Sequence, residues 1–150
     1  DSDVAWEEGA LLRLIDAPVD LVAGVYPYRR DPIEYPVHYL DKPELWADPE
    51  TGLLEVKSVA TGFTKFSRNC LEMMVKEYPE KHIYSSDRTK TFYPLFEHIF
   101  EDGYKWGEDY SFCIRWRKIG GKVWIDPEMK MGHIGNKTFI GHIGNYLKNR

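Results

Sequence analysis

The sequence feature that most constrains the fold is a helix that ends at two glycines, Gly120 and Gly121. Phe112 and Trp116 lie four residues apart and Ile119 follows three residues later, a spacing typical of one apolar helix face. A glycine after the last turn readily adopts the left-handed conformation that closes many helices. The pattern therefore predicts a helix over residues 108–118.

Two adjacent carboxylates, Glu108 and Asp109, occupy the first turn of this predicted helix. Free backbone N–H groups and the positive end of the helix dipole favour negative charge there, so one interpretation is that both residues stabilise the helix. The other interpretation is catalytic. A carboxylate at a helix start, beside Trp106 and Gly107, is well placed to accept a proton from a bound hydroxyl group. The local pattern alone favours the structural interpretation.

Composition narrows the class of protein. The length of 150 residues predicts one domain, residues 1–150, with 43% hydrophobic and 29% charged residues, as in soluble globular chains. A net charge of −4 argues against a nucleic-acid partner, because phosphate binding requires a basic surface. No apolar run approaches the roughly 20 residues of a membrane span. Cys70 and Cys113 lack metal-ligand spacing, so we expect buried, reduced thiols and a cytoplasmic protein.

Hydrophobic periodicity and the positions of proline and glycine indicate alternating helices and strands. Ser67 is a candidate N-cap for one of the helices. The alternation predicts an α/β fold with a mixed sheet and flanking helices. We expect helices over residues 7–16, 69–78 and 108–118, strands over 21–26, 122–126 and 129–133, a hairpin through 37–40 and 53–56, a strand and turn over 54–66, and an extended segment over 91–100.

The two ends of the chain carry candidate metal ligands. Asp1 and Asp3 form an Asp-x-Asp pair, and hard oxygen ligands of this kind suit a divalent cation bound to phosphate. An isolated Asp-x-Asp is common, and the alternative is a chain terminus that precedes a helix. Near the other end, the pentapeptide Gly-His-Ile-Gly-Asn occurs twice and supplies His133 and His142. Imidazole is a frequent metal ligand, so the repeat raises the question of a two-histidine site.

The order of these motifs resembles the second half of a nucleotide-sugar glycosyltransferase with the GT-A fold. The resemblance covers essentially the whole chain. Its most specific parts are Gly-Glu-Asp-Tyr-Ser-Phe-Cys at 107–113, Gly-Gly-Lys-Val-Trp-Ile-Asp-Pro at 120–127 and Gly-His-Ile-Gly at 132–135.

The resemblance implies a metal-dependent transfer of a sugar from a nucleotide-sugar donor to an acceptor hydroxyl, with inversion. Asp1 and Asp3 match the carboxylates that hold Mn²⁺ or Mg²⁺ at the donor diphosphate, and His133, rather than His142, matches the histidine that completes the site. Asp109 matches the catalytic base.

Four further expectations concern the acceptor, and they too rest on the resemblance. Glu108 is the alternative base, while Thr61, Gly62 and Trp106 match positions near the acceptor, which is a carbohydrate or another hydroxyl compound.

Family members carry a Rossmann-like nucleotide-binding half before the Asp-x-Asp, whereas this sequence starts at that motif. We therefore expect a fragment that is inactive alone. Without the preceding half, the strand over residues 21–26 should present an exposed sheet edge and pair with a second copy, which predicts a homo-oligomer.

The same residues are compatible with two other functions. The first is a carbohydrate-binding or assembly domain of the same fold without catalysis. The second is a metal-dependent phosphohydrolase, although two-metal sites usually need more carboxylates close to both ions.

Overall fold

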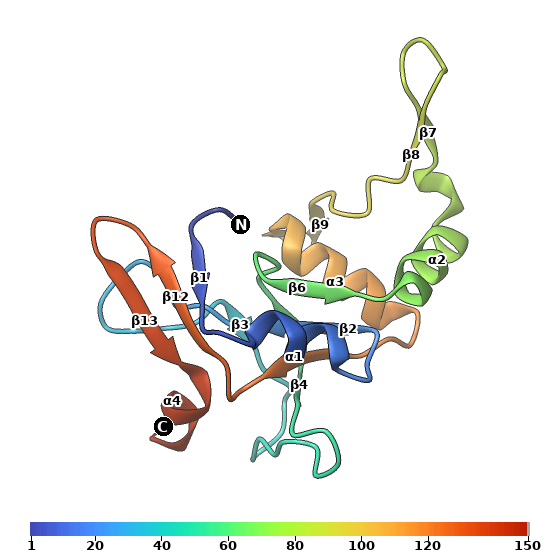
Figure 1. The fold of residues 1–150 in the computed structure, drawn as a ribbon. Helices are drawn as coiled ribbons and strands as arrows, with labels where there is room; N and C mark the ends of the chain where they lie inside the picture. Colours follow the sequence, from blue (N-terminus) through green and yellow to red (C-terminus); the bar gives the residue numbers. More distant parts are fainter. Residues whose placement is uncertain (150) are drawn as a thin grey trace.

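A four-stranded mixed sheet forms the centre of the protein, in a computed structural model that describes residues 1–149 (Figure 1). Its two central strands are parallel to each other, and each outer strand is antiparallel to its neighbour. This arrangement confirms the mixed α/β organisation. In spatial order the strands are β4 (Leu54–Val56), β11 (Val123–Asp126), β2 (Leu21–Gly24) and β6 (Thr64–Phe66).

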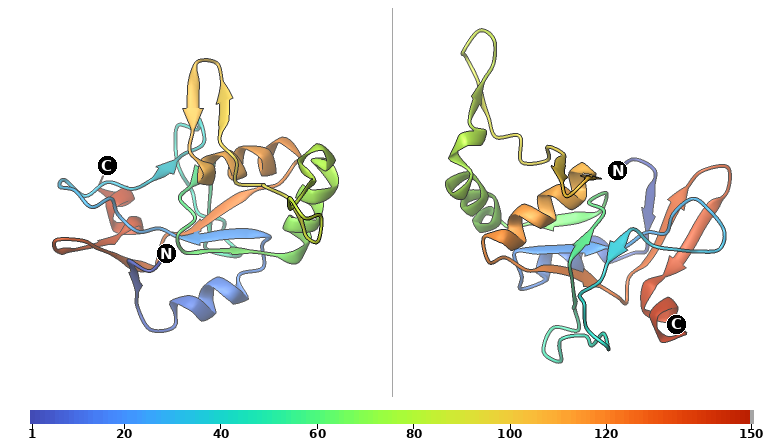
Figure 2. Two further views of the ribbon diagram at one scale, coloured as in Figure 1. Left: turned by 90° about the horizontal axis from the view of Figure 1, so that it is seen from above. Right: turned by 180° about the vertical axis from the view of Figure 1, so that it is seen from behind.

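Helices cover both faces of this sheet, because side chains along its central strands alternate between two cores. Leu21 and Ala23 pack with α2 (Arg68–Glu77) and α3 (Glu108–Lys118), whereas Val22 packs with α1 (Ala10–Asp16) on the other face. Figure 2, seen from above, shows the sheet edge-on between α1 and α3. The result is a three-layer α/β arrangement.

Helix α3 matches the prediction in both its bounds and its ends. Gly120 has a φ of +91°, and its N–H donates to the Arg117 carbonyl at 3.0 Å, while the Gly121 N–H donates to the Trp116 carbonyl at 2.9 Å. These two bonds are the Schellman motif that closes a helix. A Cβ on Gly121 would overlap the Trp116 ring, so this glycine is also needed for close packing.

Helix α2 begins at its expected cap. The Ser67 hydroxyl accepts a hydrogen bond from the Cys70 N–H at 2.9 Å, and Pro79 opens a short 3₁₀ helix, η1 (Pro79–Lys81). The free Cys70 and Cys113 side chains are both buried, as expected. Burial raises the pKa of the Cys70 thiol to about 12 and that of Cys113 to about 11.

A second, antiparallel sheet lies beside the first, and each copy of the pentapeptide begins on one of its strands. β12 stands in its centre, with the N-terminal strand β1 on one side and β13 on the other. A short helix, α4, follows β13 (Figure 1). The bounds are β1 (Val4–Trp6), β12 (Lys130–Ile134), β13 (Thr138–His142) and α4 (Ile143–Lys148).

Three two-stranded pairs complete the fold. Each is short, and the β7–β8 pair stands away from the body of the protein (Figure 1). The pairs are β3 (Val37–His38) with β5 (Ser58–Val59), β7 (Ile83–Tyr84) with β8 (Thr91–Phe92), and β9 (Ile99–Glu101) with β10 (Tyr104–Trp106).

Two expectations about strand pairing are wrong. The hairpin through residues 37–40 and 53–56 does not form, because β3 pairs with β5 while β4 joins β11 in the central sheet. The exposed edge at residues 21–26 is also absent. β2 lies between β11 and β6 and all four of its residues are buried, so this strand offers no free edge to a second copy.

Smaller differences concern element ends. The helix expected over residues 7–16 starts at Ala10, after Gly9 with a φ of +82°. The extended segment over residues 91–100 holds β8 and the start of β9, with a loop between them. None of the helices within residues 1–149 has the length and apolar character to cross a membrane.

Candidate functional site

The N-terminal strand brings Asp3 and His133 together. β1 runs antiparallel to β12 with Val4 opposite His133, and the Ile134 N–H donates to the Asp3 carbonyl at 2.8 Å. The Asp3 Oδ2 atom lies 3.4 Å from Nε2 of His133. Two of the three predicted metal ligands are therefore neighbours, although 130 positions separate them in the sequence.

The hydrogen bond of Nδ1 indicates the tautomer of the neutral His133 ring. Nδ1 lies 2.8 Å from the Pro27 carbonyl oxygen, which can only accept a hydrogen bond, so Nδ1 carries the proton. In the neutral ring, Nε2 then presents a lone pair to the Asp3 carboxylate. Metal-binding histidines commonly fix their second nitrogen on a carbonyl in this way.

The separation of these two groups also fits one ion. Ligands about 2.1 Å from a metal and at right angles to each other lie about 3 Å apart, close to the observed spacing of the Asp3 and His133 atoms. Mg²⁺ needs about six ligands, so these two side chains would supply only part of its coordination. Residues 1–149 contain no group of three or more His, Cys, Asp and Glu side chains that could hold a metal ion.

Arg29 is a neighbour of Asp3 that no motif in the sequence indicates. Its guanidinium lies 3.1 Å from Asp3 Oδ2, the same oxygen that faces His133, and also donates to the Ile134 carbonyl at 3.4 Å. A cation that binds Asp3 must therefore compete with Arg29. The only sequence signal was a basic pair, Arg29 and Arg30, shortly after a buried strand.

Asp1 lies against the turn that contains Gly62. The Asp1 nitrogen donates to the Gly62 carbonyl at 2.5 Å, and a Cβ on Gly62 would lie 2.6 Å from the Asp1 carboxylate and overlap the Tyr26 hydroxyl. Only glycine permits this close approach. Gly62 therefore lets Asp1 and the Tyr26 hydroxyl pack closely against this turn.

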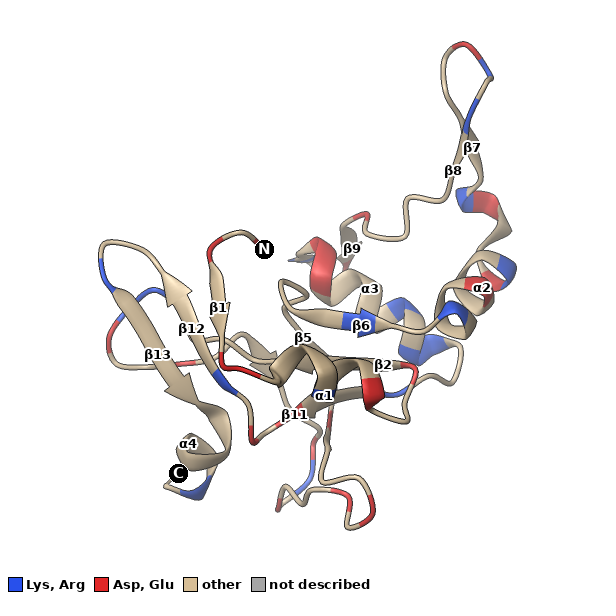
Figure 3. Ribbon diagram, viewed as in Figure 1, with Lys and Arg blue, Asp and Glu red and all other residues tan. Residues whose placement is uncertain are grey.

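Asp109 contacts the same turn through Thr61, the residue before Gly62. It lies in the first turn of α3, and the Thr61 hydroxyl donates to its Oδ1 atom. Thr61 thereby fixes the orientation of this carboxylate. Figure 3 shows that the acidic start of β1 and the acidic start of α3 lie at the same end of the protein.

Tyr26 lies between the two halves of this site. Its ring meets the edge of the His133 ring, with centroids 4.9 Å apart, and its hydroxyl lies at Gly62. Burial raises the pKa of the Tyr26 hydroxyl, and the negative charges of Asp109 and Asp3 raise it further. Tyr26 is thus a buried, neutral side chain near both Asp3 and Asp109. No motif in the sequence indicates this position.

Two expected site residues face elsewhere. The Glu108 carboxylate is more than half exposed and lies 3.8 Å from the His98 ring. The Trp106 ring lies near the His38 ring, with centroids 5.6 Å apart, and lines a neighbouring pocket. The structure therefore brings together Asp1, Asp3, Thr61, Gly62, Asp109 and His133, but not Glu108 or Trp106.

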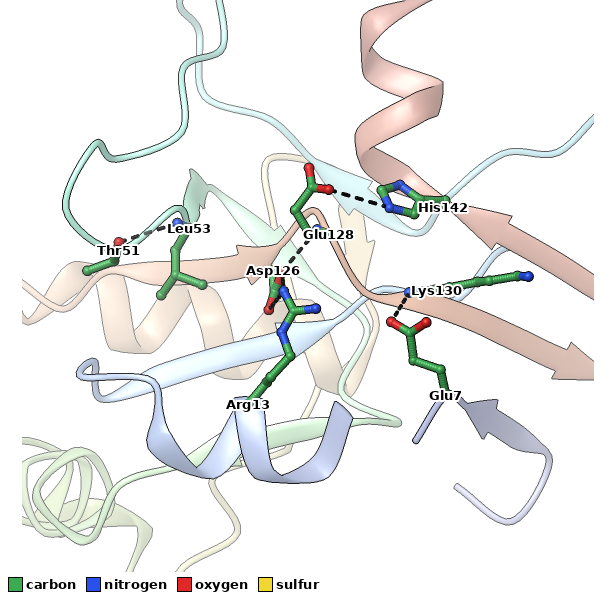
Figure 4. Close-up of polar contacts among 8 residues, drawn as sticks. All are labelled: Glu7, Arg13, Thr51, Leu53, Asp126, Glu128, Lys130 and His142. Carbon is green, nitrogen blue, oxygen red and sulfur yellow. Dashed lines mark hydrogen bonds and ion pairs between the residues drawn. The ribbon is translucent and has the colours of Figure 1, made fainter. Parts of the chain in front are cut away.

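His142 has a structural environment instead. Its Nδ1 accepts a hydrogen bond from the Asn145 N–H at 3.2 Å and so caps α4, and its Nε2 lies 3.6 Å from Glu128. Figure 4 shows this pair beside Asp126, whose carboxylate takes two hydrogen bonds from Arg13 at 2.7 and 2.8 Å. Asp126 is 7% exposed and joins α1 to the end of β11, so it too is structural.

Comparisons with protein-family models, curated proteins and solved structures found no significant match to this chain.

Proposed function

We propose that this chain is the metal- and acceptor-binding part of a glycosyltransferase of the GT-A type, which transfers a sugar from a nucleotide-sugar donor to an acceptor hydroxyl with inversion. The observation that carries the proposal is convergence. Residues 1–3, 26–29, 61–62, 109 and 133 come from five separate segments and meet at one end of the protein. Asp3 and His133, which are in contact, and the candidate base Asp109 are among them, while Asp1 lies against Gly62.

Asp109 is the proposed base. Thr61 donates to Oδ1, so the second oxygen of the carboxylate is the one that would take the proton of the acceptor hydroxyl. The hydrogen bond keeps the carboxylate from rotating, which holds Oδ2 in one direction. Glu108 is the weaker candidate, because it is exposed and faces His98.

Asp3 and His133 are the proposed ligands of a divalent cation, with Asp1 as a further carboxylate. Hard oxygen ligands suit Mg²⁺ or Mn²⁺, and the imidazole favours Mn²⁺. When bound, such an ion neutralises charge on a departing nucleotide diphosphate. Arg29, beside the same carboxylate, competes with this ion for Asp3.

The proposed setting is cytoplasmic, since both cysteines are free and buried. The test is a screen of nucleotide sugars with Mn²⁺, on this chain and on a longer protein that joins it to a nucleotide-binding half. We expect metal-dependent transfer by the longer protein that is abolished by chelation. Absence of transfer from every nucleotide sugar, with a folded protein, would contradict the proposal.

The two alternatives make different predictions in the same screen. A carbohydrate-binding domain without catalysis would bind acceptors and transfer nothing. A phosphohydrolase would release phosphate from a simple phosphoester, but Asp109 is bonded to Thr61 and Glu108 faces His98, so neither points to a second ion shared with Asp3.

A further inference from the structure

A pocket of about 770 Å³ lies beside α3, next to the site described above. Its walls come from β3, β5, the end of β10 and the outer face of α3. The β9–β10 hairpin that supplies Trp106 stands next to the start of α3 (Figure 2). Ser111 fixes this hairpin, because its hydroxyl donates to the Trp106 carbonyl at 3.1 Å and accepts from the Ile99 N–H at 2.9 Å. Hydrogen bonds to Ser111 therefore hold the hairpin that carries Trp106 against α3.

The pocket combines an apolar wall with positive charge, in a protein whose net charge is −4. Three of its lining residues are cationic, Lys57, Arg117 and Lys118, and none is acidic. The remaining wall includes Trp106, Ile114 and His38. A flat aromatic face next to cations is suited to a ring compound that carries an anionic group.

Two of the three cations can turn toward a ligand. Lys57 pairs with Asp41, whose side chain is 89% exposed, and Lys118 pairs with the half-exposed Glu101 at 3.2 Å. Exposed pairs of this kind contribute little stability, so a bound anion can replace the carboxylate. Arg117 is held more firmly, by Glu55 and by the Val56 carbonyl, each at 3.2 Å.

His38, in the wall of the pocket, contacts the first turn of α3. Its ring lies 4.5 Å from that of Tyr110, the residue that follows Asp109, and its Nδ1 lies 2.9 Å from the Ser58 hydroxyl. Burial, and then the charge of Lys57, lower the pKa of His38, which keeps this ring neutral near pH 7. A neutral imidazole at this position is a hydrogen-bonding group for a ligand hydroxyl rather than a fourth cation.

We propose that this pocket binds an acidic saccharide, with the sugar ring against Trp106 and its carboxylate or phosphate held by Lys57 and Lys118. Only the statement that this saccharide is the acceptor rests on the proposed function. Specificity for an anionic acceptor would then come from Lys118, at the end of α3, and from Lys57, between β4 and β5.

Binding without donor or metal is the test. Isothermal titration would compare cellobiouronic acid with cellobiose, and glucose 6-phosphate with glucose, at low ionic strength. We expect each acidic sugar to bind at least about 10-fold more tightly than its neutral partner, and the two pairs show whether carboxylate or phosphate is preferred. The proposal would be overturned if the acidic and the neutral sugar bound equally well in both pairs. It would also be overturned if none of the sugars bound at millimolar concentration.

Matched variants separate the pocket from general charge effects. Lys57→Gln and Lys118→Gln should each weaken binding of the acidic sugar by about 10-fold, as expected for loss of a charge-assisted hydrogen bond. Lys76→Gln, on the exposed face of α2, is the charge control. Trp106→Ala should remove binding of the ring, whereas Trp46→Ala, at a 78% exposed tryptophan, should not.

The outcome is independent of the transfer assay. If the acidic sugars bind as expected and the longer protein transfers no sugar, the pocket assignment stands and the glycosyltransferase proposal fails. If transfer occurs to neutral acceptors while the lysine variants change nothing, the pocket assignment fails alone.

Discussion

The pentapeptide Gly-His-Ile-Gly-Asn occurs twice in this chain, and the two copies have different surroundings. In the first copy, His133 faces the Asp3 carboxylate and the Tyr26 ring. In the second, His142 caps α4 and pairs with Glu128. The same five residues thus supply a candidate metal ligand in one place and a helix cap in the other. The role of each histidine comes from the strand beside it, which the motif does not specify.

The largest expected effect concerns Asp109, the proposed base, compared with His142 of the second copy. Asp109→Asn keeps the size of the side chain but removes its basicity, so transfer by a longer, active protein should fall by about 10²- to 10⁴-fold. His142→Ala, in the second copy, should change transfer less than about twofold. Steady-state rates of nucleotide release give the comparison.

Circular dichroism of the Asp109→Asn protein serves as the folding control. A large loss in Glu108→Gln with normal turnover in Asp109→Asn would reverse the assignment of the base.

The glycines of the two copies provide a second comparison, this time in stability. A Cβ on Gly141 would overlap the hydroxyl of the buried Tyr35, whose ring packs against Tyr146 with centroids 5.2 Å apart. Overpacking of this kind costs about 1–3 kcal/mol, so Gly141→Ala should lower the free energy of unfolding by that amount.

Gly132→Ala is the matched control, because its Cβ would meet Ala5 and Thr138 at 3.4 Å, an ordinary contact distance. This variant should keep its stability or gain up to about 1 kcal/mol. Urea denaturation measures both, and equal losses in the two variants would show that the packing of the second copy against Tyr35 is wrong.

The smallest expected effect concerns Arg29, which shares the Asp3 carboxylate with His133. Arg29→Ala removes a competing cation, and because exposed ion pairs contribute about 0–1 kcal/mol, the affinity for Mn²⁺ alone should rise by up to about fivefold. Arg30→Ala, at a neighbouring arginine that pairs with Glu34, is the control. Isothermal titration with Mn²⁺ distinguishes the two, and a loss of affinity in Arg29→Ala would mean that this arginine supports the site.

Elements with local signals could be predicted from the sequence. Helix α3 was predicted because its periodicity, its acidic first turn and its closing glycines all lie within 14 residues. The Ser67 cap needed only the three residues after it. Strand partners were predicted poorly, because β2 is covered by β11 and β6, which come from about 100 and 40 residues further along the chain.

In the candidate site, too, contacts between distant segments could not be predicted from local sequence patterns. The pairing of Asp3 with His133 was anticipated only through the resemblance to a family, since no local pattern links residues 130 positions apart. Arg29 and Tyr26 were missed, because each gains its position from a neighbour on another strand. Trp106 lines the pocket beside His38, and no local pattern in the sequence indicates that pocket.

The most direct test of the central claim is a titration with Mn²⁺ followed by the NMR signals of the histidine rings. The paramagnetic ion broadens the resonances of the ring it binds first. We predict that the His133 signals disappear at substoichiometric Mn²⁺ while those of His142 persist, and that Asp3→Asn abolishes this selectivity. Equal broadening of both rings, or earlier loss of His142, would contradict the assignment of Asp3 and His133 as the cation site.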